Sequence, residues 1–208
     1  MRILIVAATA AEIAPLQQRP DVEILITGVG MVAAAARTSA ALARTRYDLA
    51  LNLGICGSFD PALSLGTVVH VVSDGMPELG AEDGDTFLSI DELGLLRGDA
   101  PPFSNCRLVN AAVPVSPVLK CLPAVHGITV NTVHGNERSI AATVRRFAPQ
   151  IESMEGAGFM YACLIQAVPF AQVRAVSNMV ERRNRSAWKI DEAIASLCRV
   201  AADLIESV

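Results

Sequence analysis

The sequence is short of charged and aromatic residues. Charged residues make up 18% of its 208 positions and aromatic residues 4%, while hydrophobic residues make up 52%. The formal net charge is −4, so the chain offers no basic surface for nucleic acid. The apolar N-terminus, MRILIVAATAAEIAPL, is too short to span a bilayer and lacks the cleavage site of a secretory signal. We therefore expect a cytoplasmic protein with no nucleic-acid or membrane partner.

Paired cysteines and clustered histidines are also absent. The five cysteines are scattered without a C-x-x-C spacing, and their odd number favours reduced, buried thiols over disulfides. His70, His126 and His134 lie far apart in the sequence, which argues against a zinc site. A nucleophilic Cys–His pair stays open, although core packing is the favoured role even for Cys56 in its glycine-rich turn. The sequence therefore predicts neither a metal nor a cofactor.

Short apolar runs alternate with helical patterns along the chain. Continuous apolar runs are typical of strands buried on both faces, in a parallel or mixed sheet covered by helices. Strands are predicted at residues 2–8, 22–27, 49–54, 67–73, 124–133 and 170–178. Helices are predicted at residues 31–46, 137–148 and 155–167, and from about Lys189 onward. Residues 75–105, rich in Asp, Glu, Gly and Pro, are expected to form an inserted loop.

No repeat, linker or second domain interrupts this pattern. It predicts a single α/β domain over residues 1–208, a three-layer α/β/α sandwich with a mixed, largely parallel central sheet.

A glycine-rich turn after the second predicted strand matches the G-x-G-x-x-A pattern of dinucleotide-binding proteins. It runs from Gly28 to Ala33. Such proteins also carry an acidic residue at the end of the next strand, where it binds the ribose. Here that strand ends in Asn52-Leu53-Gly54. We therefore interpret the turn as a close strand-to-helix connection.

Four segments place unusual residues at the ends of predicted strands, where open α/β sheets bind ligands. They contain Glu12, the glycine-rich turn Gly54–Ser58, Glu155 at the start of a helix, and the pair Ser177-Asn178. Taken alone, each has a purely structural interpretation: Glu12 could start a solvated helix, Glu155 could be a favourable acid at a helix N-terminus, and Ser177-Asn178 could be an ordinary strand exit. Their combination is what points to a site.

In order and wording, the segments AATAAE, TGVGMVAAA, LGICG, ESMEG and VRAVSN resemble the nucleoside phosphorylase/nucleosidase superfamily. The resemblance is to its methylthioadenosine/S-adenosylhomocysteine nucleosidase branch, which carries A-M-x-x-E, S-G-I-G-K-V-A-A-A, T-G-x-A-G, V-E-M-E and V-R-A-I-S-D. It spans nearly the whole chain. It implies that the chain cleaves the N-glycosidic bond of a purine nucleoside, through an oxocarbenium-like sugar.

The resemblance also implies roles for single residues. Glu12 matches the carboxylate that activates water, and Glu155 the acid that binds the ribose hydroxyls, with Met154 packed below the sugar. Asn178, after Ser177, stands where the branch keeps the Asp that protonates the departing base. The resemblance also implies that backbone near Val133 borders the purine. The glycine-rich turn that begins at Gly54 has an exposed backbone that could approach a ligand closely, whatever the family.

Hydrolysis is favoured over phosphorolysis. Phosphorolysis needs arginines and a glycine-rich loop around an anion. The early loop presents Glu12 instead, and the turn at Gly54–Ser58 has no arginine. A carboxylate repels phosphate and can polarise water. Ile55, where the branch usually has a small polar residue, leaves the hydrogen bonding around Glu12 open.

The amide of Asn178 selects the base. Adenine carries an exocyclic amine beside the imidazole-ring nitrogen, which a carboxyl group complements. Hypoxanthine carries a keto oxygen there, and an amide can donate to that oxygen while accepting from the ring N–H. Asn178 therefore predicts a 6-oxopurine nucleoside.

A run of arginines after Asn178 points to an anionic substrate. Arg182, Arg183 and Arg185 are expected near the mouth of the pocket, with Arg182 and Arg185 as candidate ligands and Trp188 as a pocket wall. A solvated loop or a dimer contact is the alternative for the arginines, and anchoring of the last helix is the alternative for Trp188. The pattern S-N…E-x-R-x-R-S-A-W resembles the branch that hydrolyses futalosine in menaquinone biosynthesis. Futalosine is an inosine derivative that ends in a carboxylated aromatic ketone.

The rival interpretations are a methylthioadenosine-type nucleosidase, a purine phosphorylase and a non-catalytic nucleoside sensor. The presence of both Glu12 and Glu155 argues against a sensor that has lost its catalytic site. The family resemblance implies a homodimer or a higher homo-oligomer.

Overall fold

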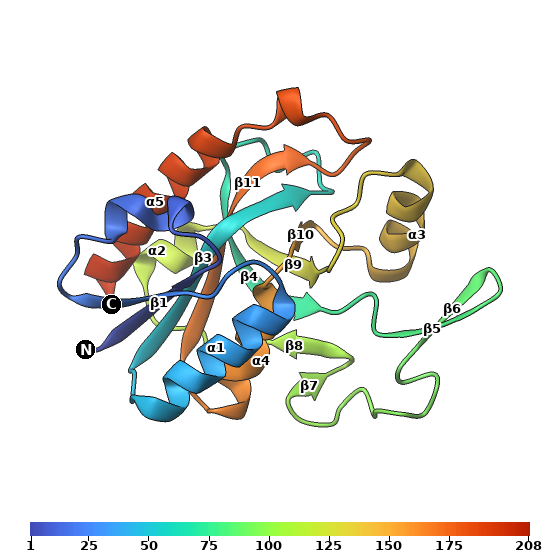
Figure 1. Cartoon of the computed structure of the whole chain (residues 1–208), viewed down its shortest axis with the longest axis horizontal. Coiled ribbons are helices and arrows are strands. Elements are labelled where there is room, and N and C mark those ends of the chain that lie inside the picture. Colours follow the sequence, from blue (N-terminus) through green and yellow to red (C-terminus); the bar gives the residue numbers. More distant parts are fainter.

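A computed structural model describes all residues, 1–208, and shows a sheet covered by helices on both faces (Figure 1). The strands are β1 Ile3–Ala7, β2 Val22–Ile26, β3 Leu49–Ser58, β4 Val68–Gly75, β5 Gly80–Asp83, β6 Thr86–Ser89, β7 Phe103–Ser104, β8 Arg107–Val109, β9 Ala124–Thr129, β10 Ile151–Ser153 and β11 Phe170–Met179. The α-helices are α1 Met31–Arg44, α2 Pro117–Cys121, α3 Glu137–Phe147, α4 Gly156–Ile165 and α5 Ile190–Ser207. Two 3-10 helices, η1 Ala11–Leu16 and η2 Arg185–Ala187, complete the chain.

The central sheet is mixed, and its longest strands form the centre. Nine strands run in the order β2-β1-β3-β10-β9-β4-β8-β7, with β11 paired to both β3 and β4. Strands β2, β1, β3 and β11 are mutually parallel where they pair, whereas β10 runs antiparallel to β3 and β4 antiparallel to β11. The predicted sandwich with a mixed, largely parallel sheet is confirmed.

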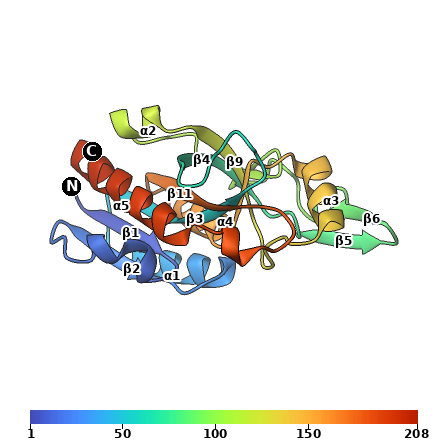
Figure 2. The ribbon, with the colours of Figure 1, turned by 90° about the horizontal axis from the view of Figure 1, so that it is seen from above.

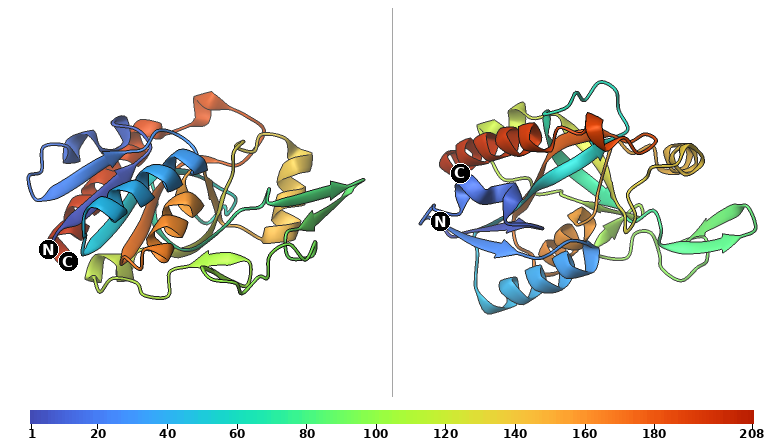
Figure 3. Two further views of the ribbon diagram at one scale, coloured as in Figure 1. Left: turned by 60° about the horizontal axis from the view of Figure 1, so that its bottom comes forward. Right: turned by 45° about the horizontal axis from the view of Figure 1, so that its top comes forward.

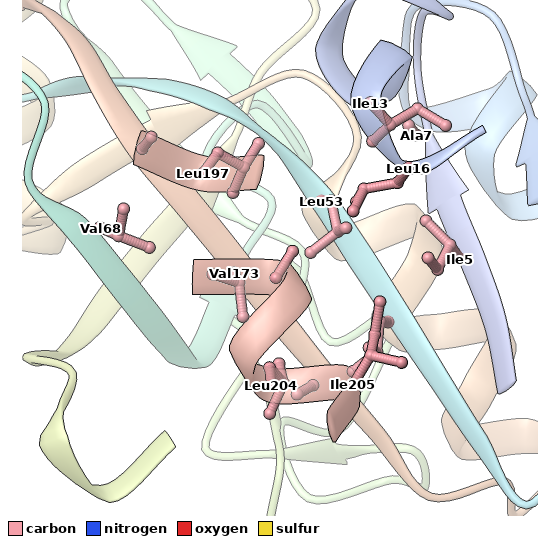
Figure 4. Packing of buried hydrophobic residues seen from close by; sticks show 14 of the residues in the cluster. Ile5, Ala7, Ile13, Leu16, Leu53, Val68, Val173, Leu197, Leu204 and Ile205 are labelled. Atoms are coloured by element: carbon pink, nitrogen blue, oxygen red, sulfur yellow. The ribbon is translucent and has the colours of Figure 1, made fainter. Parts of the chain in front are cut away.

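Two apolar layers fix the helices to the sheet. Helices α1 and α4 lie side by side on one face, and α5 covers the opposite face (Figures 2 and 3). The backbones of α1 and α4 come so close that a Cβ on Gly158 would collide with the carbonyl oxygen of Met31. On the other face, Leu197 and Leu204 of α5 share a buried cluster with Leu53 of β3 and with Ile13 of η1 (Figure 4). This cluster anchors η1, the element that carries Glu12.

Several boundaries differ from those expected. The loop expected over residues 75–105 is wrong in part, because β5 and β6 form a hairpin there and β7 pairs with β8. This hairpin projects beside α3, away from the sheet (Figure 1). Strand β3 extends to Ser58, past its glycines, because β10 and β11 pair with its second half. The short elements η1, β8, α2 and β10 carry too few residues to show a period in the sequence.

All five cysteines are free, and Cys56, Cys163 and Cys198 are buried. None of the helices combines the length and the apolar composition that a membrane crossing requires.

Candidate active site

A cavity of about 430 Å³ lies along the second half of β3 and gathers most of the predicted site residues. Its walls come from η1, from the segment around β10, from the end of β11 and from the first turn of α5. The predicted residues that line it are Glu12, Ile55, Val133, Met154, Glu155, Ser177, Asn178 and Trp188. Gly54, Arg182 and Arg185 are not among its lining residues.

Glu12 is buried and held by three donors. Its Oε2 accepts hydrogen bonds from Thr9 N at 2.9 Å and Thr9 Oγ1 at 3.0 Å, and its Oε1 accepts one from Ile55 N at 3.3 Å. A carboxylate oxygen accepts about two hydrogen bonds. Oε2 is therefore saturated, while Oε1 keeps one lone pair. The backbone of Ile55, not its side chain, supplies the hydrogen bond that the sequence left open.

Gly54 acts by having no side chain. Any Cβ at this position would clash with Arg174 Nη1 and would lie 3.1 Å from Glu12 Oε1. The missing Cβ leaves room for the guanidinium of Arg174, whose side chain is 1% exposed. Sequence reasoning missed Arg174, which stands in an apolar strand. The only signal was a long cation in a run otherwise suited to the core.

Arg174 joins two polar groups beneath the cavity. Its Nη2 donates to Asn52 Oδ1 at 2.5 Å, and its Nη1 lies 3.6 Å from Glu155 Oε2. Its Nε has no partner. The guanidinium charge is therefore already shared among buried protein groups.

Glu155 precedes the first residue of α4. Its Oε1 accepts a hydrogen bond from Gly30 N at 3.1 Å. Gly30 has a φ of 103°, a conformation that favours glycine, so the turn that resembled a dinucleotide motif instead orients this carboxylate. The start of α4 is fixed in turn, because Thr129 Oγ1 accepts from Ala157 N at 2.7 Å and donates to buried Asp74.

Asn178 reaches the cavity through a break in strand register. Along β11 the pairing with β3 shifts between Val176 and Asn178, so that Asn178 pairs with Gly57. A bulge of this kind turns a side chain toward the other face. Asn178 Nδ2 donates to Met179 O at 3.0 Å, and its Oδ1 lies 2.9 Å from Ser177 Oγ. The second proton on Nδ2 has no partner in the structure.

A pair that the sequence did not single out lies at the same end of the cavity. Glu152 Oε2 is 2.5 Å from His134 Nδ1, and Glu152 Oε1 accepts from His134 N at 3.0 Å. His134 Nε2 is 2.9 Å from Thr143 Oγ1. The hydrogen bond with Glu152 raises the pKa of His134 above its ordinary value. The signal in the sequence was the first acid of ESMEG, two residues ahead of the Met-Glu pair that this segment shares with V-E-M-E.

The arginine run is divided between two surfaces. Arg183 lines the cavity, and its guanidinium carbon lies 5.2 Å from the centre of the Trp188 ring. Arg182 lines a neighbouring groove beside α3, and Arg185 begins η2. All three side chains are exposed. Of the three arginines expected near the mouth of the pocket, Arg183 is thus the one that lines the cavity, whereas Arg182 and Arg185, the expected ligands, do not.

Cys56 also lines the cavity, but its thiol has no nucleophilic character. Burial raises its pKa to about 12, so it stays protonated near neutral pH. No hydrogen bond joins it to a histidine, which removes the structural basis of a Cys–His pair.

Comparisons with known proteins agree with this geometry. A model of the phosphorylase superfamily matches residues 3–208. Futalosine hydrolase of Streptomyces coelicolor is 36% identical over 88% of this chain and 78% of its own length, and that of Thermus thermophilus is 32% identical over 87% and 80%.

Solved structures share the fold at lower identity. A 5′-methylthioadenosine/S-adenosylhomocysteine nucleosidase from Neisseria meningitidis matches with a TM-score of 0.83, 16% identity and coverage of 100% of this chain and 99% of its own. Futalosine hydrolase of Helicobacter pylori matches with a TM-score of 0.78, 13% identity and coverage of 99% and 97%. On the sequence matches, the chain belongs to the phosphorylase superfamily and, within it, to the futalosine hydrolase family.

Proposed function

We propose that the chain hydrolyses the N-glycosidic bond of futalosine and releases hypoxanthine, as a step of menaquinone biosynthesis. One observation carries the proposal: a single cavity is lined by a candidate base, a candidate ribose ligand and an amide that suits a 6-oxopurine, namely Glu12, Glu155 and Asn178. Each of the three chemical tasks of a nucleosidase thus has a side chain of the right type.

Glu12 is the proposed base. The free lone pair on Oε1 can accept a proton from water, and the water oxygen then bonds to C1′ of the ribose. The bond between C1′ and the purine nitrogen breaks, and its electron pair stays on the base. The imidazole ring of the base takes up a proton from solvent and Glu12 releases its proton to solvent, so that no net proton is gained or lost. The bonds from Thr9 and Ile55 hold the carboxylate in one orientation, which preorganises the attack.

The buried arginine supports hydrolysis over phosphorolysis. A phosphorylase needs a cation free to bind phosphate. The guanidinium of Arg174 is engaged by Asn52 and Glu155, and the carboxylate of Glu12 lies beside it. Phosphate at this position would meet the carboxylates of Glu12 and Glu155, and the arginine beside them already contacts Asn52 and Glu155.

Asn178 is the proposed partner of the leaving base. The free proton on Nδ2 can donate to a keto oxygen, while Oδ1 keeps acceptor capacity for the ring N–H of departing hypoxanthine. Stabilising charge on the base in this way lowers the barrier to bond cleavage. Adenine would place its exocyclic amine against the same amide proton.

Arg183 and Trp188 are the proposed contacts for the acidic aromatic tail. A guanidinium beside an aromatic ring can pair with a carboxylate while the ring stacks on an aromatic group. Both residues line the cavity, on the segment between β11 and α5. Lys189 N donates to Ser177 O at 2.8 Å, which ties this segment to the strand that carries Asn178.

The decisive experiment offers futalosine, inosine and methylthioadenosine separately, with and without phosphate, and measures free base. We expect futalosine to be cleaved fastest, in phosphate-free buffer and without added metal. Formation of a ribose 1-phosphate, or a preference for methylthioadenosine, would contradict the proposal.

We further propose that the enzyme works in the cytoplasm as a homodimer or a higher homo-oligomer. Val29 lines the cavity and is 59% exposed, and Val32 in the first turn of α1 is 78% exposed. Apolar side chains at the rim of a cavity are suited to being covered by a second copy. Light scattering on the wild type and on Val32→Glu tests this, because a charge at the interface should shift the mass toward the monomer.

A further inference from the structure

Three residues on three neighbouring strands form one row across the sheet. Gly57 of β3 pairs with Glu152 of β10 on one side and with Asn178 of β11 on the other. A Cβ built on Gly57 would lie 2.9 Å from a methyl carbon of Val180, 3.2 Å from Asn178 Nδ2 and 3.5 Å from Glu152 Cγ. Because paired residues share a face of the sheet, the carboxylate and the amide stand on either side of a position without a side chain.

The carboxylate of Glu152 is fixed but not saturated. His134 donates to it twice, from its backbone N and from its ring, with one bond to each oxygen. Each oxygen therefore keeps one lone pair. Glu152 is 3% exposed, and the surface it presents belongs to the cavity. A fixed, desolvated acceptor at this position selects for a donor on the ligand.

Hypoxanthine presents such a donor next to the groups that Asn178 can pair with. Along one edge of the departing base lie the N7 hydrogen, the keto oxygen O6 and the N1 hydrogen. The row offers a matching sequence of acceptor, donor and acceptor: Asn178 Oδ1, Asn178 Nδ2 and Glu152. Adenine has an amine in place of the keto oxygen and a lone pair at N1, so it mismatches the last two positions.

We propose that Glu152 is a specificity-determining residue that accepts the N1 hydrogen of a 6-oxopurine, with His134 as the positioning residue that fixes its carboxylate. This inference rests on the proposed function and specifies how its base is recognised. The inference also explains why ESMEG differs from the V-E-M-E motif of the nucleosidase branch. When ESMEG is aligned with V-E-M-E on the shared Met-Glu, Glu152 replaces a valine that cannot form a hydrogen bond.

The test measures binding of free hypoxanthine and free adenine by calorimetry, because product binding does not depend on catalysis. The variant is Glu152→Gln, whose amide oxygen can stay on a His134 donor while its NH₂ group turns toward the base. We expect the preference for hypoxanthine over adenine to fall about tenfold or more, because a charge-assisted hydrogen bond is replaced by two facing donors.

Glu78→Gln is the matched control. Glu78 also anchors this part of the chain, accepting from Asn131 N and Asn131 Nδ2, but it does not line the cavity. The preference should be unchanged in this variant. An unchanged preference in Glu152→Gln, or an equal change in both variants, would overturn the inference.

If Glu152→Gln does not fold, His134 supplies the second test. His134→Ala leaves Glu152 in place but removes the ring donor that fixes its carboxylate. This variant should weaken the binding of hypoxanthine more than the binding of adenine. His134→Gln, which restores a side-chain donor, should recover part of that loss. If His134→Ala weakened the binding of both bases equally, and His134→Gln restored none of it, the contact between His134 and Glu152 would be purely structural. Failure of the proposed function is distinct, since it means that the wild type does not cleave futalosine.

Discussion

The guanidinium Nη1 of Arg174 lies 3.6 Å from Oε2 of Glu155, and both side chains are almost completely buried. Asn52 and the missing side chain of Gly54 complete the setting of this arginine. A buried ion pair contributes little net stability, but removal of one partner leaves an uncompensated charge. The pair therefore fixes the relative positions of β11, β3 and the start of α4, which together carry the cavity.

Gly54→Ala should disturb this arrangement. The new Cβ would overlap Arg174 Nη1, and the buried guanidinium would have to leave its hydrogen bond to Asn52, so the free energy of unfolding should fall by about 1–3 kcal/mol. Turnover should fall with it, because Glu12 Oε1 lies beside the same position. Chemical denaturation and steady-state rates measure the two effects. Gly75→Ala is the control, since a Cβ there meets Arg107 only at 3.6 Å. Equal behaviour of the two variants would contradict the assignment.

Glu12→Gln should lower kcat by roughly 100-fold or more while substrate still binds, because the base is lost and the shape is kept. All three partners of this carboxylate donate, so the amide NH₂ must face the backbone N–H of Ile55 or that of Thr9, whichever oxygen it replaces. Thr9→Val, which removes only the hydroxyl donor, should have a smaller effect on kcat. Single-turnover rates and substrate Kd values check both variants. Near-normal turnover in Glu12→Gln would place the base elsewhere.

Asn178→Asp should shift the discrimination between bases toward the 6-amino purine. A carboxylate oxygen would face the keto oxygen of hypoxanthine, so an attraction is replaced by a repulsion. We expect kcat/KM for futalosine to fall by about 100-fold or more and the ratio for its 6-amino analogue to improve. The two specificity constants, measured for wild type and variant, decide the matter. An unmoved ratio would show that Asn178 does not read the base.

Arg183→Ala should raise KM for futalosine and leave inosine, which lacks the acidic tail, nearly unaffected. We expect an increase of about tenfold, at the lower end for a charge-assisted hydrogen bond because Arg183 is exposed. Arg182→Ala and Arg185→Ala are controls, since neither residue lines the cavity. If Arg182→Ala or Arg185→Ala raises KM for futalosine as much as Arg183→Ala does, the acidic tail does not bind at Arg183.

The bond between His134 and Glu152 should make stability depend on pH. The pKa of His134 is raised above its ordinary value of 6.5 by this hydrogen bond. The stabilisation is therefore complete below that value and is lost as pH rises through the folded pKa. The loss of unfolding free energy in His134→Gln should be larger at about pH 6 than at about pH 9. His126→Gln is the control, because its ring contacts the Ser73 hydroxyl and no carboxylate. A difference independent of pH would contradict the argument.

The sequence predicted the sandwich and most of its long elements, because strands buried on both faces and amphipathic helices leave a clear periodic pattern. It also brought forward Glu12, Glu155 and Asn178, which stand in local motifs. It missed the role of Arg174 because that role depends on Gly54 and Asn52, which belong to another strand. It missed Glu152 because the row with Gly57 and Asn178 arises from strand register and from the bulge beside Ser177, and neither leaves a local signal.

In the proposed binding mode, the second half of β3 also sets the size of the base that fits. Ile55 holds Glu12 at the sugar end, and Gly57 lies between Glu152 and Asn178 at the base end. Ile55 and Gly57 are two residues apart on an extended strand, so they are separated by roughly 7 Å. Strand pairing within the sheet keeps this distance fixed. The single ring of a pyrimidine presents its edge closer to the glycosidic carbon than the double ring of a purine. A pyrimidine nucleoside would therefore leave either the water-activating end or the row of polar groups without its partner.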